Sequence, residues 1–254
     1  MDITISEIFE QLALTFAVFL RIGPAIALTP GYGESSTPAR VKLAIAFFLS
    51  AAMVPIVENK LPGQDLTYDQ MVRFLLAETV FGFFLGIVSR GILLLLEQAG
   101  VVISQVVSLA QLVGNATALL PVIGHVLTVT GLAIIMSGPL GKQIILAFVV
   151  SYELSVGSLP LILHAIAEIG SKIVNFVFVN GVALAGSFLV LFFVYYLFTG
   201  FVNKAMPQFM VSFVGIPFVA LLSIYYLHRN SELILTVWQE KSLSILMMPF
   251  EALK

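Results

Sequence analysis

Long apolar stretches separated by short polar segments dominate the chain. A helix that crosses a membrane needs about 20 mostly apolar residues, because the hydrocarbon layer is about 30 Å thick. The pattern therefore predicts a chain built of membrane helices. The strongest candidates are Ile8–Leu28, Val41–Val57, Met71–Leu96, Ile173–Val202 and Phe209–Leu227.

Other apolar stretches are too short or too interrupted to be plain spanning helices. Ala99–Val113 is short and carries Ser and Gln, and Pro121–Met136 is separated from Ile144–Tyr152 by a Gly-Pro break. A weak segment ends at Ile169. These features predict helices that bend or turn back, which membranes tolerate only where protein or a water-filled cavity surrounds them. The C-terminal tail, Glu232–Lys254, has a pattern typical of a helix on a membrane surface or a partner.

Composition restricts the class of protein. Of the 254 residues, 59% are hydrophobic and 10% are charged, and the mean hydropathy is +1.07. Soluble domains carry about 25% charged residues, so we expect an all-α integral membrane protein and exclude a soluble enzyme or a nucleic-acid-binding module. The first charges are acidic rather than basic, so we expect the N-terminus to be retained rather than cleaved as a signal peptide.

The sequence offers little for catalysis. It contains no Cys, no H-E-x-x-H, no G-x-S-x-G and no G-x-G-x-x-G. The three histidines, His125, His164 and His228, are far apart and match no metal spacing. We therefore expect no catalytic residue, no metal and no cofactor.

Charged residues inside apolar stretches are the most informative positions. One charge at the centre of a bilayer costs about 2.5–3.5 kcal/mol on insertion scales. Glu78, Gly82, Gly86 and Arg90 recur every four residues and form one stripe on a helix. The two glycines allow close approach of another backbone. The stripe predicts a helix–helix seam, either across subunits or within this chain.

Arg21 lies two-thirds along the first apolar stretch. Its guanidinium needs an interface position or a partner. Snorkelling or local pairing would satisfy it within the chain. Pairing with an acid on another subunit is the alternative hypothesis.

Uncharged polar residues form a second stripe along the chain. Ser104, Ser108, Gln111 and Asn115 are spaced by four, three and four residues, and Gln98 and Gln105 add polarity nearby. Such a stripe can face a water-filled conduit without binding any particular ion. It can equally form hydrogen bonds between helices, and both interpretations remain open.

Several motifs, in their order along the chain, resemble the FliR family of type III protein export gate subunits. The N-terminal signature is similar to Leu20–Pro24, Pro30 and Pro38–Ala44 here. Glu78 with Gly82 and Gly86 resembles a Glu/Gly-bearing helix, and Ala99-Gly100 before Ser104-Gln105 resembles a central segment. Near the C-terminus, the matching positions of the basic-x-x-Pro-Gln loop and the Gly-x-Pro element are Lys204, Pro207, Gly215 and Pro217.

The resemblance implies a non-catalytic gate subunit. Family members join FliP and FliQ subunits around a pore in the bacterial inner membrane at the flagellar basal body, with FlhB associated, and unfolded export substrates pass through it. It implies one membrane-embedded domain over residues 1–254. Residues 1–170 would be a FliP-like part of bent helical hairpins, and residues 171–254 a FliQ-like hairpin with a C-terminal amphipathic helix.

By the same resemblance, the stretch from about Gln98 to Pro121 would supply a plug that closes the pore. A conduit for many unfolded sequences should bind none strongly, which fits uncharged lining residues. The expected pore or plug residues are Gln98, Ser104, Gln105, Ser108, Gln111 and Asn115. The expected interface residues are Arg21, Glu78, Gly82, Gly86, Arg90, Lys204, Pro207, Gly215 and Pro217.

Two alternatives remain. A small-solute secondary transporter would use Arg21, Glu78, Arg90 or Glu153 for coupling. A passive scaffold would leave the pore entirely to its partners.

Overall fold

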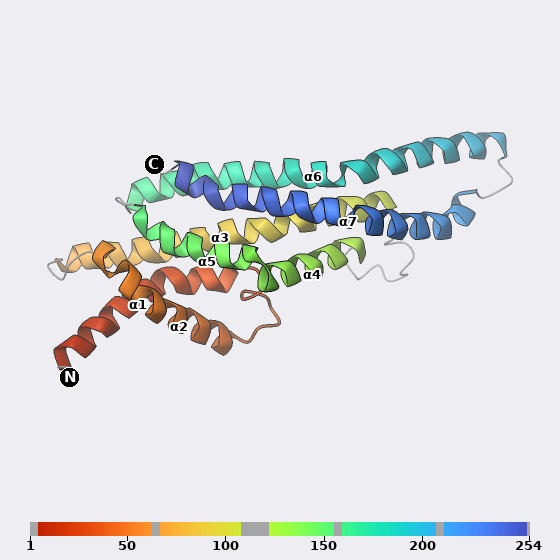
Figure 1. Ribbon diagram of the computed structural model, residues 1–254. Coiled ribbons are helices and arrows are strands. Elements are labelled where there is room, and N and C mark those ends of the chain that lie inside the picture. The colour runs from red at the N-terminus through yellow and green to blue at the C-terminus, as the bar shows by residue number, and fades with distance from the viewer. Residues whose placement is uncertain (1–4, 62–66, 108–121, 155–158, 207–210, 253–254) are drawn as a thin grey trace. The chain divides into compact units, whose positions relative to one another are not determined.

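The computed structural model describes residues 5–61, 67–107, 122–154, 159–206 and 211–252 (Figure 1). Within these residues every regular element is a helix and none is a strand, which confirms the all-α prediction. Two short 3₁₀ turns, η1 (Glu58–Lys60) and η3 (Ser151–Glu153), follow helices. The α-helices are α1 (Ile5–Leu28), α2 (Ala39–Val57), α3 (Tyr68–Val107), α4 (Val122–Ser137), α5 (Pro139–Val150), α6 (Leu159–Ala205) and α7 (Val211–Ala252).

The helices confirm an integral membrane protein. Four of them are long and apolar enough to cross a bilayer within the described residues. The helices α4 and α5 form a further candidate span, bent by 65° where they meet. The predicted break lies at this bend. Gly138 is extended and Pro139 begins α5, and proline is tolerated there because the first N–H groups of a helix have no intrahelical partner.

Three predicted breaks were wrong. The stretches Met71–Leu96 and Ala99–Val113 were expected to be separate, but α3 runs without interruption to Val107. It contains no proline, and Glu97-Gln98 does not stop a helix, because neither residue removes a backbone donor. Likewise α6 continues from Leu159 through Ser171-Lys172. In the same way, α7 joins the last apolar stretch to the C-terminal tail.

That tail buries its apolar face in the chain itself. Trp238, Ser242 and Ile245 are each 0% exposed. The apolar stripe of residues 232–252 was expected to meet a membrane surface or a partner. Its most deeply buried positions are instead covered by other helices of the same protein.

The residues cluster into two compact units that are interleaved along the sequence. The first comprises Met1–Ile92, Ala133–Val174 and Leu243–Lys254. The second comprises Leu93–Leu132 and Asn175–Ser242. In the first unit α1 and α2 pack as a hairpin (Figure 1). The division of the chain near residue 170 stays a prediction. Fully buried side chains at the two cores include Ile22, Ile26, Ile92 and Phe148 in the first unit, and Leu95, Leu96, Ile103, Phe188, Phe192 and Trp238 in the second.

Candidate functional site

A buried ion pair lies at the centre of the first unit. Arg21 of α1 and Glu78 of α3 are each 1% exposed. Arg21 Nε donates to Glu78 Oε2 at 2.6 Å, and Nη2 donates to Glu78 Oε1 at 2.7 Å. This fork-to-fork geometry matches the planar guanidinium to the carboxylate and gives short, strong hydrogen bonds. Each residue therefore supplies the opposite charge that the other requires in an apolar environment.

The third guanidinium nitrogen reaches a third segment. Arg21 Nη1 lies 3.0 Å from the Ser151 carbonyl oxygen and 3.2 Å from Ser151 Oγ. Ser151 Oγ in turn donates to the Phe148 carbonyl at 2.6 Å. The Ser151 carbonyl, which follows α5, also accepts the Leu154 N–H at 3.3 Å, so Arg21 occupies its second acceptor position. One side chain thus ties together α1, α3 and the turn η3.

Aromatic rings complete the surroundings of the guanidinium. Its carbon lies 3.9 Å from the centre of the Tyr152 ring and 4.9 Å from that of Phe81. Both distances are within the range of cation–π attraction. The Tyr152 hydroxyl is buried and has no hydrogen-bond partner among the described residues. Tyr152 therefore contributes its ring rather than its hydroxyl to the cluster.

The two glycines of the stripe let α3 approach α1 closely. A Cβ atom added at Gly82 would overlap the backbone carbonyl oxygen of Arg21. One added at Gly86 would lie 2.8 Å from Leu28 Cβ and 3.1 Å from the Ala25 carbonyl oxygen. This close approach places Glu78, one turn before Gly82, against Arg21. The seam lies within the chain, between α1 and α3.

The last member of the stripe holds the linker between α1 and α2. Arg90 Nη1 forms an ion pair of 2.5 Å with Glu34 Oε1, and both side chains are partly buried. Lys42 Nζ donates to the Gly33 carbonyl at 2.9 Å. Gly31, at φ +89°, supplies the left-handed turn that brings the chain out of α1. The linker is therefore anchored to α3 by a charge pair.

The described part of the uncharged polar stripe lies in the second unit, where it packs between helices. Ser104 is buried, and its Oγ accepts a hydrogen bond of 3.3 Å from the Gly124 N–H in the first turn of α4. That N–H has no partner within α4, so Ser104 acts as a cap from another helix. A Cβ added at Gly100 would overlap the Gly124 backbone.

The two glutamines of this group have different environments. Gln98 is partly buried, and a Cβ added at Gly181 of α6 would lie 2.9 Å from its Cγ. Gln105 is exposed. Ser108, Gln111 and Asn115 lie outside the described residues. Of the predicted pore residues that the structure describes, only Gln105 is exposed.

A comparison with known protein families identifies the family of this chain. Residues 12–244 match the model of the family described as bacterial export proteins, family 1. The chain belongs to the FliR family of bacterial export proteins. It is 27% identical over 238 residues to the flagellar biosynthetic protein FliR of Caulobacter vibrioides, which covers 91% of this chain and 93% of the relative. It is 26% identical to the FliR protein of Escherichia coli, over 88% and 86% of the two chains. It is 28% identical to that of Aquifex aeolicus, over 85% and 84%.

The C-terminal positions of the FliR signature are less informative in the structure. Lys204 is exposed in the last turn of α6. Pro207 lies outside the described residues. Gly215 and Pro217 belong to the first two turns of α7. Their role at an interface stays a prediction.

A cavity of about 780 Å³ lies in the first unit between α5 and the end of α7. Most of its lining is aliphatic or aromatic, and the polar members are Gln143 and Glu153. Glu153 is paired with Lys60 at 3.1 Å. No group of three or more potential metal ligands occurs among the described residues. The cavity therefore suits an apolar occupant better than a polar solute.

Sequence reasoning identified Arg21 and Glu78 but missed Ser151. Its backbone carbonyl is the acceptor that completes the guanidinium, and it lies 130 residues from Arg21. A carbonyl carries no sequence signal. The Gly138-Pro139 break predicts a bent pair of helices, but it lies at the start of α5, whereas Ser151 follows the end of that helix.

Proposed function

We propose that this chain is a non-catalytic subunit of the flagellar type III export gate in the bacterial inner membrane. It would stand at the basal body with FliP-like and FliQ-like subunits and an FlhB-like protein, and form part of the pore for unfolded substrates. The observation that carries the proposal is the match along nearly the full length of three proteins named flagellar biosynthetic protein FliR.

The length of the exposed apolar surface supports a role in an assembly. Between Lys172 and Lys204, α6 has no charged residue over residues 173–203. At 1.5 Å per residue this stretch is about 47 Å long, and a tilt of about 40° still leaves about 36 Å along the membrane normal. The hydrocarbon layer is about 30 Å thick.

Little of this helix is covered by the chain itself. Only 22% of its most apolar window is buried, and Phe193, Phe198 and Phe201 are 64%, 67% and 72% exposed. The hydrocarbon layer alone does not span the full length of such a surface. Neighbouring protein subunits would cover the remainder.

Purification tests this function directly. The tagged chain is extracted in mild detergent from its own cells, and native mass spectrometry gives the composition of the complex. One copy of this chain with several copies of smaller hydrophobic subunits is the expected result. A monomer or homodimer, from cells shown to express the candidate partners, would contradict the proposal.

The plug belongs to the same proposal. Residues 98–107 of the predicted plug stretch form the C-terminal end of α3. The plug would therefore come from residues 108–121. Deleting residues 108–115 keeps Ser104 and its bond to α4. We expect higher ion leakage through the assembled gate, measured as conductance in planar bilayers. Replacing Ser108, Gln111 and Asn115 together by Ala is the length-matched control and should leak less than the deletion.

Unchanged conductance in a deletion variant that assembles completely would reject the plug and favour the passive scaffold.

The charges that a secondary transporter would need are already paired within the chain. Arg21 is bonded to Glu78, Arg90 to Glu34, and Glu153 to Lys60. This pairing counts against the transporter hypothesis. Deleting the gene distinguishes the two functions. Loss of a gate subunit abolishes motility and protein export, whereas loss of a transporter impairs growth on one nutrient.

A further inference from the structure

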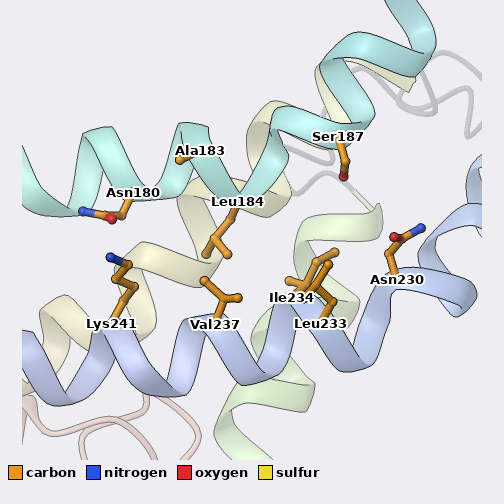
Figure 2. A pocket seen from close by; sticks show the side chains of 9 residues that line it. All are labelled: Asn180, Ala183, Leu184, Ser187, Asn230, Leu233, Ile234, Val237 and Lys241. Atoms are coloured by element: carbon orange, nitrogen blue, oxygen red, sulfur yellow. The ribbon is translucent and has the colours of Figure 1, made fainter.

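A shallow groove runs between α6 and α7 in the second unit (Figure 2). Its volume is about 240 Å³. The two helices also meet through buried aromatic rings. Phe188 and Phe192 are each 0% exposed, and the Phe188 ring meets Tyr226 edge to face at 4.9 Å. The groove is therefore preformed by the packing of its own two helices.

The lining residues recur at helical spacing on both sides. On α6 they are Asn180, Ala183, Leu184 and Ser187, at i, i+3, i+4 and i+7. On α7 they are Asn230, Leu233, Ile234, Val237 and Lys241, at i, i+3, i+4, i+7 and i+11. Two neighbouring helices with such faces form a row of holes that receives the side chains of a third helix.

The polar groups of the groove stand at its two ends. Asn180 and Lys241 lie at one end, Ser187 and Asn230 lie at the other, and the aliphatic residues lie between them (Figure 2). Lys241 follows Asn230 by eleven positions on α7, which is about 16 Å along the helix. The amide nitrogens of Asn180 and Asn230 bond to Phe176 and Tyr226 carbonyls in their own helices.

Lys241 is partly buried and has no carboxylate partner among the described residues. The nearest acid in sequence, Glu240, is exposed. Residues adjacent in a helix do not face each other. An ammonium group in an apolar groove requires an opposite charge or water. A single lysine among apolar contacts is also a known device for selecting one partner and one register.

We propose that this groove receives a helix of another membrane subunit, whose apolar face carries one Asp or Glu opposite Lys241. A lipid fits less well, because its phosphate would occupy the Lys241 end and its acyl chain would cover Ser187 and Asn230. A helix can place polar groups at both ends, two to three turns apart. The inference rests on the proposed function, because it requires that the chain belongs to a complex of several subunits. It adds where one subunit contact lies and which charged groups form it.

The test uses the complete complex from its own cells and four variants, Lys241→Glu, Lys241→Gln, Lys241→Arg and Lys142→Ala. Lys142 is an exposed cation on α5 outside the groove, so Lys142→Ala is the control. In Lys241→Glu we expect native mass spectrometry to show about 30-fold weaker retention of one protein subunit, because a charge in the contact loses its partner. Lys241→Gln should lose less. Lys241→Arg and Lys142→Ala should retain the subunit.

The identity of the partner charge gives the second measurement. The subunit that is lost must carry an Asp or Glu within a membrane helix, and its replacement by Lys should restore the Lys241→Glu complex. An unchanged composition in Lys241→Glu would overturn the inference and leave the gate function intact. Loss of lipid-sized masses alone would assign the groove to an anionic lipid instead. A wild-type chain without any subunit would overturn the gate function itself.

Discussion

Replacing Glu78 with Gln is expected to prevent stable folding of the first unit or to destabilise it by about 3–5 kcal/mol. The substitution keeps the size of the side chain and removes the charge that neutralises Arg21. Arg21 is 1% exposed, and its guanidinium would remain charged in an apolar interior. For a chain of this size, about 3–5 kcal/mol corresponds to a fall of about 10 °C in the midpoint of thermal unfolding. The measurement is the unfolding of the purified protein in detergent.

Three further variants separate charge from packing. Arg21→Met with Glu78→Leu removes both charges and should lose less stability than either single change, because no unpaired charge is left. Tyr152→Phe removes a hydroxyl without a partner among the described residues and should be nearly neutral. Arg73→Ala breaks an exposed pair with Asp69, for which we expect at most about 1 kcal/mol.

A Glu78→Gln protein as stable as the wild type would show that water or another group satisfies Arg21. The junction of α1, α3 and η3 would then rest on apolar packing. A double variant that is less stable than both single variants would show that Arg21 and Glu78 each stabilise the unit independently of their pairing.

The sequence was sufficient to recognise which charges need partners, but not to find the partners. Arg21 and Glu78 were identifiable because insertion into a bilayer makes each of them costly. They are 57 residues apart, so no local spacing connects them. The four-residue stripe of Glu78, Gly82, Gly86 and Arg90 was visible, because helical periodicity is a local property. Whether that stripe meets another helix of this chain or of another subunit depends on tertiary packing.

The errors in the helix boundaries have one physical origin. Polar or charged residues at Glu97-Gln98 and Ser171-Lys172 were interpreted as ends of spanning segments. Hydropathy reports the preference of a segment for the bilayer, whereas helix continuity depends on backbone donors and steric restriction. Lys172 instead forms an i, i+4 pair with Glu168 at 2.7 Å on the surface of α6. A helix continues through such residues wherever protein or water surrounds it.

The seam between α1 and α3 should be more sensitive to an added methyl group than to any exposed change in the same helices. In Gly82→Ala, the new Cβ would overlap the Arg21 carbonyl oxygen. The α3 backbone fixes the position of the Cβ, and the carbonyl belongs to the α1 backbone, so neither group can rotate away and the two helices must separate. Overpacking of this kind typically costs about 1–3 kcal/mol. Here the separation also stretches the Arg21–Glu78 bonds, so we expect a loss at the upper end of that range or beyond it.

Gly186→Ala is the matched control for this substitution. An added Cβ at Gly186, inside α6, meets nothing within 4 Å. Alanine favours a helix over glycine by about 1 kcal/mol, so Gly186→Ala should leave stability unchanged or raise it. Thermal unfolding in detergent and motility of cells carrying each variant are the two measurements. A Gly82→Ala protein with wild-type stability would show that α1 and α3 adjust their separation freely, and the close approach would then not be what positions Glu78 against Arg21.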